Sequence, residues 1–260
     1  MIKIGAMNNP MKNLLREIQW IGENNFDFID LTLEPPGALA EEVDVESVRD
    51  LLNKYRLDVI GHTAYYLPIA SPYQRFADLA VDELRRCFIV FQMLEVQKVN
   101  LHPDELAAGI LSKERAIVRN IKAIERIEKE ASNFGLKLIL ENSLRIFNSV
   151  KDFNRLFESV DGVGFHLDVG HANLNTEKNK TPELLENFAD RLEHVHMSDN
   201  KSGNADLHLP LGAGLIPWNK MISALKKSGY DGTITLEVFS RDKRYLLASR
   251  DKLLEMWGED

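Results

Sequence analysis

Cysteine and long apolar runs are scarce in this chain, and each shortage excludes a class of protein. The single cysteine, Cys87, cannot form an internal disulfide, so a reducing cytoplasmic location is the simplest expectation. No apolar stretch approaches the roughly 20 residues that span a bilayer. No long apolar run follows a basic start near Met1 either. We therefore expect neither a signal peptide nor a membrane partner.

Positive charge is also in short supply. The chain has 32 lysines and arginines against 40 aspartates and glutamates, for a net charge of −8. Proteins that bind nucleic acid usually carry a basic surface that neutralises phosphates. The acidic balance makes nucleic acid an unlikely partner, although it does not exclude a local basic groove.

Length and patterning favour a single domain over residues 1–260. The chain is close to the roughly 250 residues of one (β/α)₈ barrel, and no low-complexity linker divides it. Short apolar runs rich in Val, Ile and Leu alternate with amphipathic stretches, which is typical of buried parallel strands and the helices between them. Strands are predicted at residues 2–6, 26–33, 57–62, 97–102, 136–141, 162–168, 192–197 and 233–238.

Helices are predicted between these strands from apolar periodicity and capping residues. Asp44 precedes a helix over 45–55, and Ser112 precedes a long one that ends near 134, before Gly135. Others are expected over 11–23, 82–94 and 218–228, with Cys87, Trp20 and Trp218 in core positions. Eight such units fit either a closed α/β TIM barrel or an open doubly wound sheet.

Potential metal ligands occur at or beside the end of each predicted strand from the third to the eighth. These residues are His62, His102, Glu141, Asp168, His196 and Glu237, with His171, Asp206 and His208 shortly after strand ends. Only a closed barrel brings all of these ends to one centre, so the pattern favours a single (β/α)₈ TIM barrel. Mixed imidazole and carboxylate ligands suit Zn, Mn, Co or Fe. We expect His194 to point to the opposite side of its strand from His196 and to be structural.

Five motifs occur in an order that resembles the xylose-isomerase-like TIM-barrel superfamily. They are Leu140-Glu141-Asn142, Asp168-Val169-Gly170-His171, His196-Met197-Ser198-Asp199, the segment from Asp206-Leu207-His208 to Gly212-Ala213-Gly214, and Leu236-Glu237. The superfamily contains sugar and sugar-phosphate isomerases and epimerases, and also the endonuclease IV family of apurinic/apyrimidinic endonucleases. For the isomerase branch, the resemblance implies one divalent ion, with Mg among the candidates, held by Glu141, Asp168, His196 and Glu237. It also implies proton exchange by the two glutamates and substrate binding by His171.

The endonuclease IV branch is the alternative that the resemblance leaves open. That branch uses a trinuclear zinc site, whose additional ligands match His62, His102, His171, Asp206 and His208. Tyr65 matches a tyrosine that the branch places against DNA. Ketohexose epimerases usually have an arginine near the loop after the seventh strand, where this chain has Asp206-Leu207-His208. This difference leaves the identity of the substrate open and is compatible with a second metal ion.

The leading hypothesis is an isomerase or epimerase of a small sugar, sugar phosphate or hydroxy-ketone that reacts through a metal-stabilised enediolate. We expect no basic cluster in the strand-end loops, where Arg145 and Lys201 are isolated, and those loops are short for binding a DNA duplex. Glu34 would repel a phosphate but could bind a polyol. His62 and His171, with Lys201 as a weaker candidate, would contact the substrate. A noncatalytic sugar-binding barrel is a third reading, and a homo-oligomer is compatible with the family.

Overall fold

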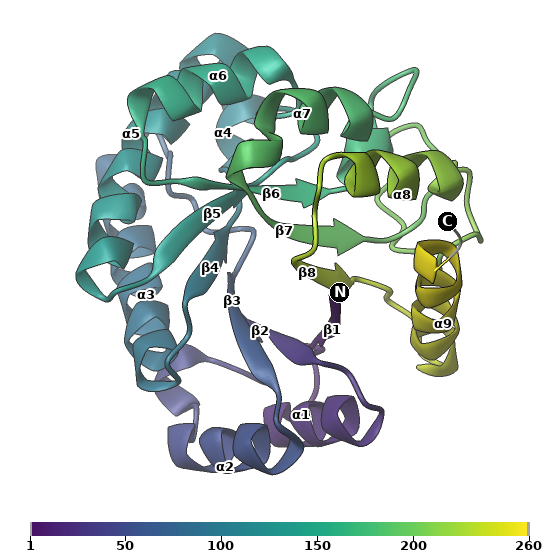
Figure 1. Ribbon diagram of the computed structural model, residues 1–260. Helices are drawn as coiled ribbons and strands as arrows, with labels where there is room; N and C mark the ends of the chain where they lie inside the picture. Colours follow the sequence, from purple (N-terminus) through teal and green to yellow (C-terminus); the bar gives the residue numbers. More distant parts are fainter. Residues whose placement is uncertain (1, 259–260) are drawn as a thin grey trace.

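The computed structural model describes residues 2–258, which form eight parallel strands closed into a barrel (Figure 1). Each strand pairs in parallel with the next, and β1 pairs with β8. The predicted TIM barrel is therefore confirmed. The strands are β1 (Lys3–Met7), β2 (Phe28–Leu33), β3 (Asp58–Thr63), β4 (Lys98–Leu101), β5 (Lys137–Glu141), β6 (Gly164–Asp168), β7 (Leu192–Met197) and β8 (Thr233–Leu236).

An outer ring of helices surrounds the barrel (Figure 1). These are α1 (Leu14–Glu23), α2 (Val45–Tyr55), α3 (Gln74–Met93), α4 (Glu105–Ile110), α5 (Lys113–Asn133), α6 (Val150–Ser159), α7 (Thr181–Phe188), α8 (Trp218–Lys227) and α9 (Arg244–Gly258). Short 3₁₀ turns cover Ala40–Glu42, His171–Asn173 and Ala189–Arg191. Among the described residues, no helix combines the length and apolar character needed to cross a membrane.

The helix caps predicted at Asp44, Ser112 and Gly135 are confirmed. The side chains of Asp44 and Ser112 accept hydrogen bonds from the first turns of α2 and α5. Gly135 adopts a φ of +72° after α5, where a glycine avoids steric strain. Two boundaries differ from prediction: α1 begins at Leu14, after an Asn13 cap, and α3 begins at Gln74 rather than near residue 82.

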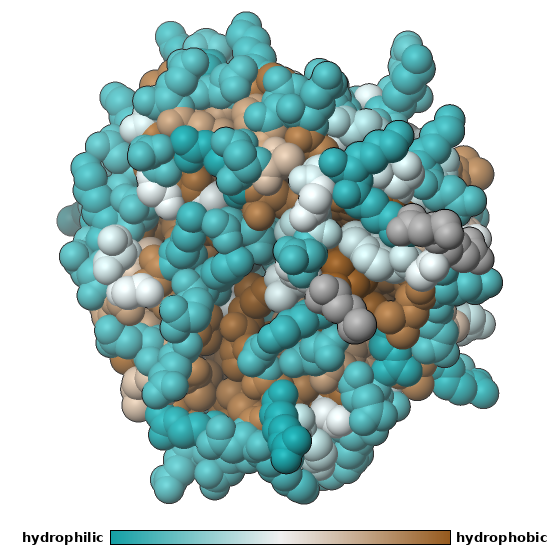
Figure 2. All heavy atoms as spheres, viewed as in Figure 1, coloured by the Kyte–Doolittle hydropathy of each residue, from teal (hydrophilic) through white to brown (hydrophobic). Residues whose placement is uncertain are grey.

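The hydrophobic core fills the space between the barrel and the helices. Every residue of β2 and β6 is buried, including the polar Asp30, Thr32, His166 and Asp168, as expected for parallel strands covered on both faces. Figure 2 shows hydrophilic residues over the outer helices and hydrophobic residues gathered toward the middle of the same face. Cys87 is buried in α3, as predicted, and burial raises the pKa of its thiol to about 12.

Candidate metal centre and cavity

Four predicted metal ligands meet at the carboxyl end of the barrel. Glu141 and Asp168 are the last residues of β5 and β6, His196 is the penultimate residue of β7, and Glu237 directly follows β8. The His196 Nδ1 atom lies 3.3 Å from Glu237 Oε2 and 4.0 Å from Asp168 Oδ2. It also lies 4.0 Å from Glu141 Oε2. Closure of the barrel therefore converts four distant sequence positions into one cluster.

Each of these four side chains has a buried polar atom with no hydrogen-bond partner. The atoms are Glu141 Oε1, Asp168 Oδ2, His196 Nδ1 and Glu237 Oε2. A buried polar group left unpaired costs about 1–3 kcal/mol, and an unpaired carboxylate costs more. Coordination of a divalent cation would satisfy all four atoms together, and one imidazole with three carboxylates is a donor set that suits such an ion. The residues therefore fit the metal that the sequence predicts.

His62 and His102 extend the cluster on one side. Their Nε2 atoms are 2.8 Å apart, and His102 Nε2 lies 3.5 Å from Glu141 Oε2. Burial lowers the pKa of His102 to about 4, so its ring is neutral and able to coordinate a metal at pH 7. Asn100 donates to Glu141 Oε2 at 2.7 Å and holds that carboxylate in place.

His171, Asp206 and His208 extend the cluster on the other side. Asp206 Oδ2 lies 3.0 Å from His171 Nε2 and 2.9 Å from His208 Nε2. Burial opposes ionisation of Asp206, but its hydrogen bonds to the two histidines outweigh burial and lower its pKa. His171 Nδ1 lies 3.1 Å from Glu141 Oε1. All nine predicted candidate ligands thus lie in one connected cluster.

Asp30 is a functional candidate that the sequence interpretation missed. It is fully buried inside the barrel, where Oδ2 lies 2.7 Å from His196 Nε2 and Oδ1 lies 3.2 Å from His62 Nδ1. The hydroxyl of Thr235 donates to it at 2.9 Å. Burial opposes its charge, but the surrounding histidines, His62 foremost, hold its pKa well below the usual range. A lone aspartate inside the apolar run of β2 is the signal that could have identified it.

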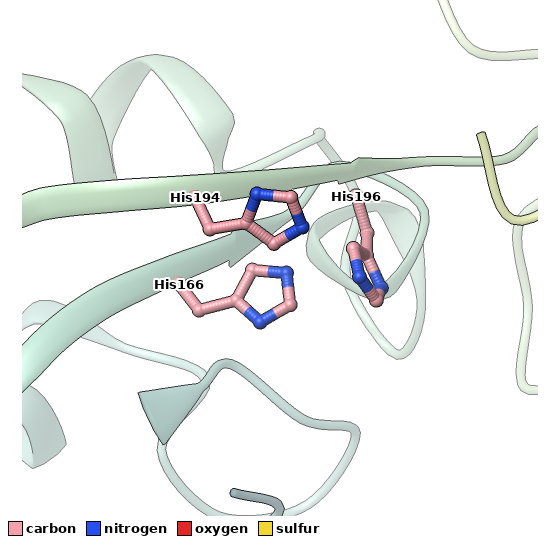
Figure 3. Close-up of side chains that lie close together, drawn as sticks. All are labelled: His166, His194 and His196. Atoms are coloured by element: carbon pink, nitrogen blue, oxygen red, sulfur yellow. The ribbon is translucent and has the colours of Figure 1, made fainter. Parts of the chain in front are cut away.

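The expectation that His194 lies on the opposite side of β7 from His196 is wrong. Residues two positions apart on a strand point to the same side, and both rings enter the barrel beside His166 (Figure 3). The His194 and His196 ring centroids are 5.1 Å apart. Both nitrogens of His194 have hydroxyl partners, Thr233 at 2.8 Å and Thr235 at 3.0 Å. Full hydrogen bonding is compatible with the predicted structural role of His194.

A cavity of about 790 Å³ opens above the cluster. Its wall includes Glu237 and the imidazoles of the outer ligands, while Glu141, Asp168 and His196 lie wholly buried beneath it. Glu34 also lines the cavity, and burial raises the pKa of its carboxyl group. Among residues 2–258, the basic side chains that line it are all histidines, namely His62, His102, His171 and His208.

Several other predicted residues lie away from this cavity. Lys201 and Arg145 are exposed and are not part of its wall. Trp218 is buried and donates its indole N–H to Asp199 at 2.9 Å. Trp20 packs half-buried against the core and lines a separate hollow, so neither tryptophan lines this cavity. Tyr65, by contrast, lines the cavity and is 66% exposed.

The expectation of only isolated basic residues in the strand-end loops is also wrong. A separate hollow beside the cavity is lined by five basic side chains from the segments after β1 and β8, namely Lys12, Arg16, Arg241, Lys243 and Arg244. The two segments are far apart in the sequence and adjacent in the barrel because β1 pairs with β8.

Fold and site together define a TIM barrel with a carboxylate–imidazole centre at the carboxyl ends of its strands. The family model described as xylose isomerase-like TIM barrel matches residues 18–256. The chain belongs to this family, which confirms the predicted resemblance.

The relatives that the chain resembles differ in the activities that their names give. The chain is 27% identical to an uncharacterized protein of Methanocaldococcus jannaschii (94% of this chain, 85% of that protein). It is 27% identical to a probable endonuclease 4 of Thermosipho melanesiensis (83% and 84%) and 22% identical to an inosose isomerase of Halalkalibacterium halodurans (93% and 88%). The solved structure of a D-tagatose 3-epimerase-like protein matches with a TM-score of 0.85 at 24% identity (98% and 97%).

Proposed function

We propose that this protein is a divalent-metal-dependent isomerase or epimerase of a small sugar, sugar phosphate or hydroxy-ketone. The observation that carries the proposal is the set of four buried, unpartnered ligand atoms on Glu141, Asp168, His196 and Glu237. They lie beneath a cavity with room for a small ligand. The similarity to an inosose isomerase supports the same class of reaction.

The four residues would hold one ion, with Zn, Mn, Co and Mg as candidates. When bound, the ion supplies Lewis-acid polarisation of a substrate carbonyl, which acidifies the neighbouring C–H bond. The positive charge of the ion would also offset the repulsion between the carboxylates of the cluster. Glu34, His62 and His171 border the cavity and would orient substrate hydroxyl groups by hydrogen bonds.

Glu237 is the group that we assign to the first proton transfer. It lines the cavity and is 8% exposed, whereas Glu141 is wholly buried in the cluster beneath. The Glu237 carboxylate would take a proton from the carbon beside the carbonyl. Return of that proton by Glu237 to the former carbonyl carbon, together with transfer of the hydroxyl proton to the former carbonyl oxygen, gives isomerisation. Epimerisation needs a proton on the opposite face of the first carbon; Glu141 would deliver it only when protonated, and the proton held by Glu237 would then pass through solvent to restore Glu141.

Endonuclease IV-like cleavage at abasic sites is a second candidate, favoured by one specific observation. The five additional ligands of a trinuclear site (His62, His102, His171, Asp206 and His208) all adjoin the central cluster. The similarity to a probable endonuclease 4 supports it. The cavity argues against it, because neither lysine nor arginine lines its wall to meet DNA phosphates.

The two candidates are separated by measuring metal content and turnover on the same preparation. We would strip the protein with a chelator and reload it with each candidate metal. Ketoses, with and without a phosphate, would then be incubated in D₂O and followed by NMR. We expect about one tightly held ion per chain and metal-dependent deuterium incorporation beside the carbonyl. Three zinc ions per chain, incision of abasic-site DNA at sub-stoichiometric protein, and no deuterium incorporation would establish the endonuclease instead.

A further inference from the structure

A second hollow, of about 660 Å³, lies next to the cavity and has the opposite electrostatic character. We call it the cationic pocket; its lining has five basic residues, two acidic residues and one tryptophan, namely Lys12, Arg16, Arg241, Lys243, Arg244, Glu17, Asp242 and Trp20. It stands out in a chain whose net charge is −8. Five cations gathered at one place create a positive potential that favours the binding of an anion.

Internal ion pairs compensate only part of this charge. Lys243 Nζ pairs with Glu17 at 2.8 Å, and Arg244 pairs with Asp242 at 2.6 Å. The side chains of Lys12, Arg16 and Arg241 have no ion-pair or hydrogen-bond partner within residues 2–258. An excess of three positive charges therefore faces the pocket.

Two helix N-termini add to this positive potential. Arg16 lies in the first turn of α1, and Arg244 is the first residue of α9. The helix dipole favours an anion and disfavours a cation at that end. A bound anion with several acceptor oxygens would offset both unfavourable placements and engage the unpaired guanidinium groups.

A third, smaller hollow of about 360 Å³ shares wall residues with both the cationic pocket and the cavity above the metal cluster. It shares Lys12, Arg241 and Lys243 with the cationic pocket. It shares Met7, Asn9 and Phe239 with the cavity. Arg241 follows Glu237 by four residues, so their Cα atoms are at most about 14 Å apart.

We propose that the cationic pocket binds the phosphate group of a phosphorylated substrate whose carbonyl end lies beside Glu237. This inference rests on the proposed function and narrows its substrate class to sugar phosphates. It also accounts for the lack of lysine and arginine around the cavity itself, because the phosphate is held outside it. The cluster is confined to the segments after β1 and β8, which suits one anionic group better than a long nucleic-acid backbone.

The test compares two triple variants with equal loss of charge. Lys12→Ala/Arg16→Ala/Arg241→Ala removes the unpaired cations, and all three residues are exposed, so the fold should be retained. The control, Lys122→Ala/Lys220→Ala/Lys227→Ala, removes exposed cations from α5 and α8. Binding of sorbitol 6-phosphate and of sorbitol would be measured by calorimetry at 150 mM salt. Neither probe contains a carbonyl group, so binding is measured without turnover.

We expect wild type and control to bind sorbitol 6-phosphate more tightly than sorbitol. The pocket variant should bind the phosphorylated probe at least about tenfold more weakly. With ketose phosphates, its KM should rise while kcat and the turnover of unphosphorylated ketoses stay close to wild type. Loss of phosphate binding in the pocket variant alone supports the inference even if no ketose reacts, in which case only the proposed function fails.

Equal affinity of wild type and pocket variant for sorbitol 6-phosphate would overturn the inference, even if ketoses turn over. So would an equal loss of affinity in the control variant. Tighter binding of abasic-site DNA than of the phosphorylated polyol, lost in the pocket variant, would reassign the pocket to nucleic acid.

Discussion

Two neighbouring layers inside the barrel are equally buried and rich in histidine, but they differ in how their polar atoms are satisfied. In the lower layer (Asp30, His166 and His194), both nitrogens of His194 have hydroxyl partners and Asp30 accepts hydrogen bonds from several groups, whereas His166 Nε2 has no partner. The upper layer is the candidate metal cluster of Glu141, Asp168, His196 and Glu237, and each of these residues has a buried atom with no hydrogen-bond partner. Burial and residue type are thus shared, and it is the unpartnered carboxylate oxygens of Glu141, Asp168 and Glu237 that distinguish the candidate site from the layer below.

His196 links the two layers. Its Nε2 atom faces Asp30, and its Nδ1 atom faces the carboxylate cluster. A carboxylate behind a metal-binding imidazole fixes the ring orientation and increases its basicity. We therefore assign the lower layer to positioning and the upper layer to chemistry.

The largest expected effect comes from the upper layer. Glu237→Gln removes the carboxylate that faces the cavity while keeping its shape, and we expect turnover to fall by at least about 10³-fold, because the proton acceptor is lost along with a ligand. Steady-state kinetics on a reactive ketose, with metal in excess, would measure this. Glu186→Gln, an exposed glutamate on α7, is the matched control. Wild-type turnover of Glu237→Gln would remove this residue from the mechanism.

An intermediate effect is expected from the residue that connects the layers. Asp30→Asn removes the charge behind His196 and His62 and should weaken metal affinity by about 10–100-fold. Competition with a chromophoric chelator measures that affinity independently of activity. Unchanged metal affinity, with circular dichroism showing an intact fold, would mean that Asp30 serves only the packing of the barrel.

A smaller effect is expected within the lower layer. His194→Gln disturbs the hydrogen bonds to Thr233 and Thr235 and should lower the free energy of unfolding by about 1–3 kcal/mol. Because both ring nitrogens of His194 already have hydroxyl partners, we expect the metal stoichiometry to stay as in wild type. Urea unfolding and elemental analysis together test this, and a lost ion would place His194 in the metal centre.

The smallest functional effect is expected from a buried group outside both layers. Because burial raises the pKa of Cys87 to about 12, the native thiol stays neutral at pH 8 and should resist a thiol reagent. In urea its pKa returns toward about 8.5, and labelling should become rapid. Cys87→Ala should keep wild-type turnover. Fast labelling of the folded protein would show that the α3 core opens readily.

Part of the site follows directly from sequence order. Glu141 and Asp168 end apolar runs, and parallel strands must end at the same edge, so their convergence with His196 and Glu237 could be anticipated. The direction of His194 could also have been obtained from the two-residue period of a strand. Asp30 could not be assigned in the same way, because its role depends on side chains from β3 and β7 that reach it across the barrel.

The sequence by itself determined the repeated strand and helix units, the family, and the ligand types at the strand ends, because periodicity and motif order are local properties of the chain. Only the tertiary structure decided which polar atoms stay unpartnered and that Lys12 and Arg241, near opposite ends of the chain, share one pocket. Both depend on barrel closure, which pairs β1 with β8 and sets distances that no linear pattern contains.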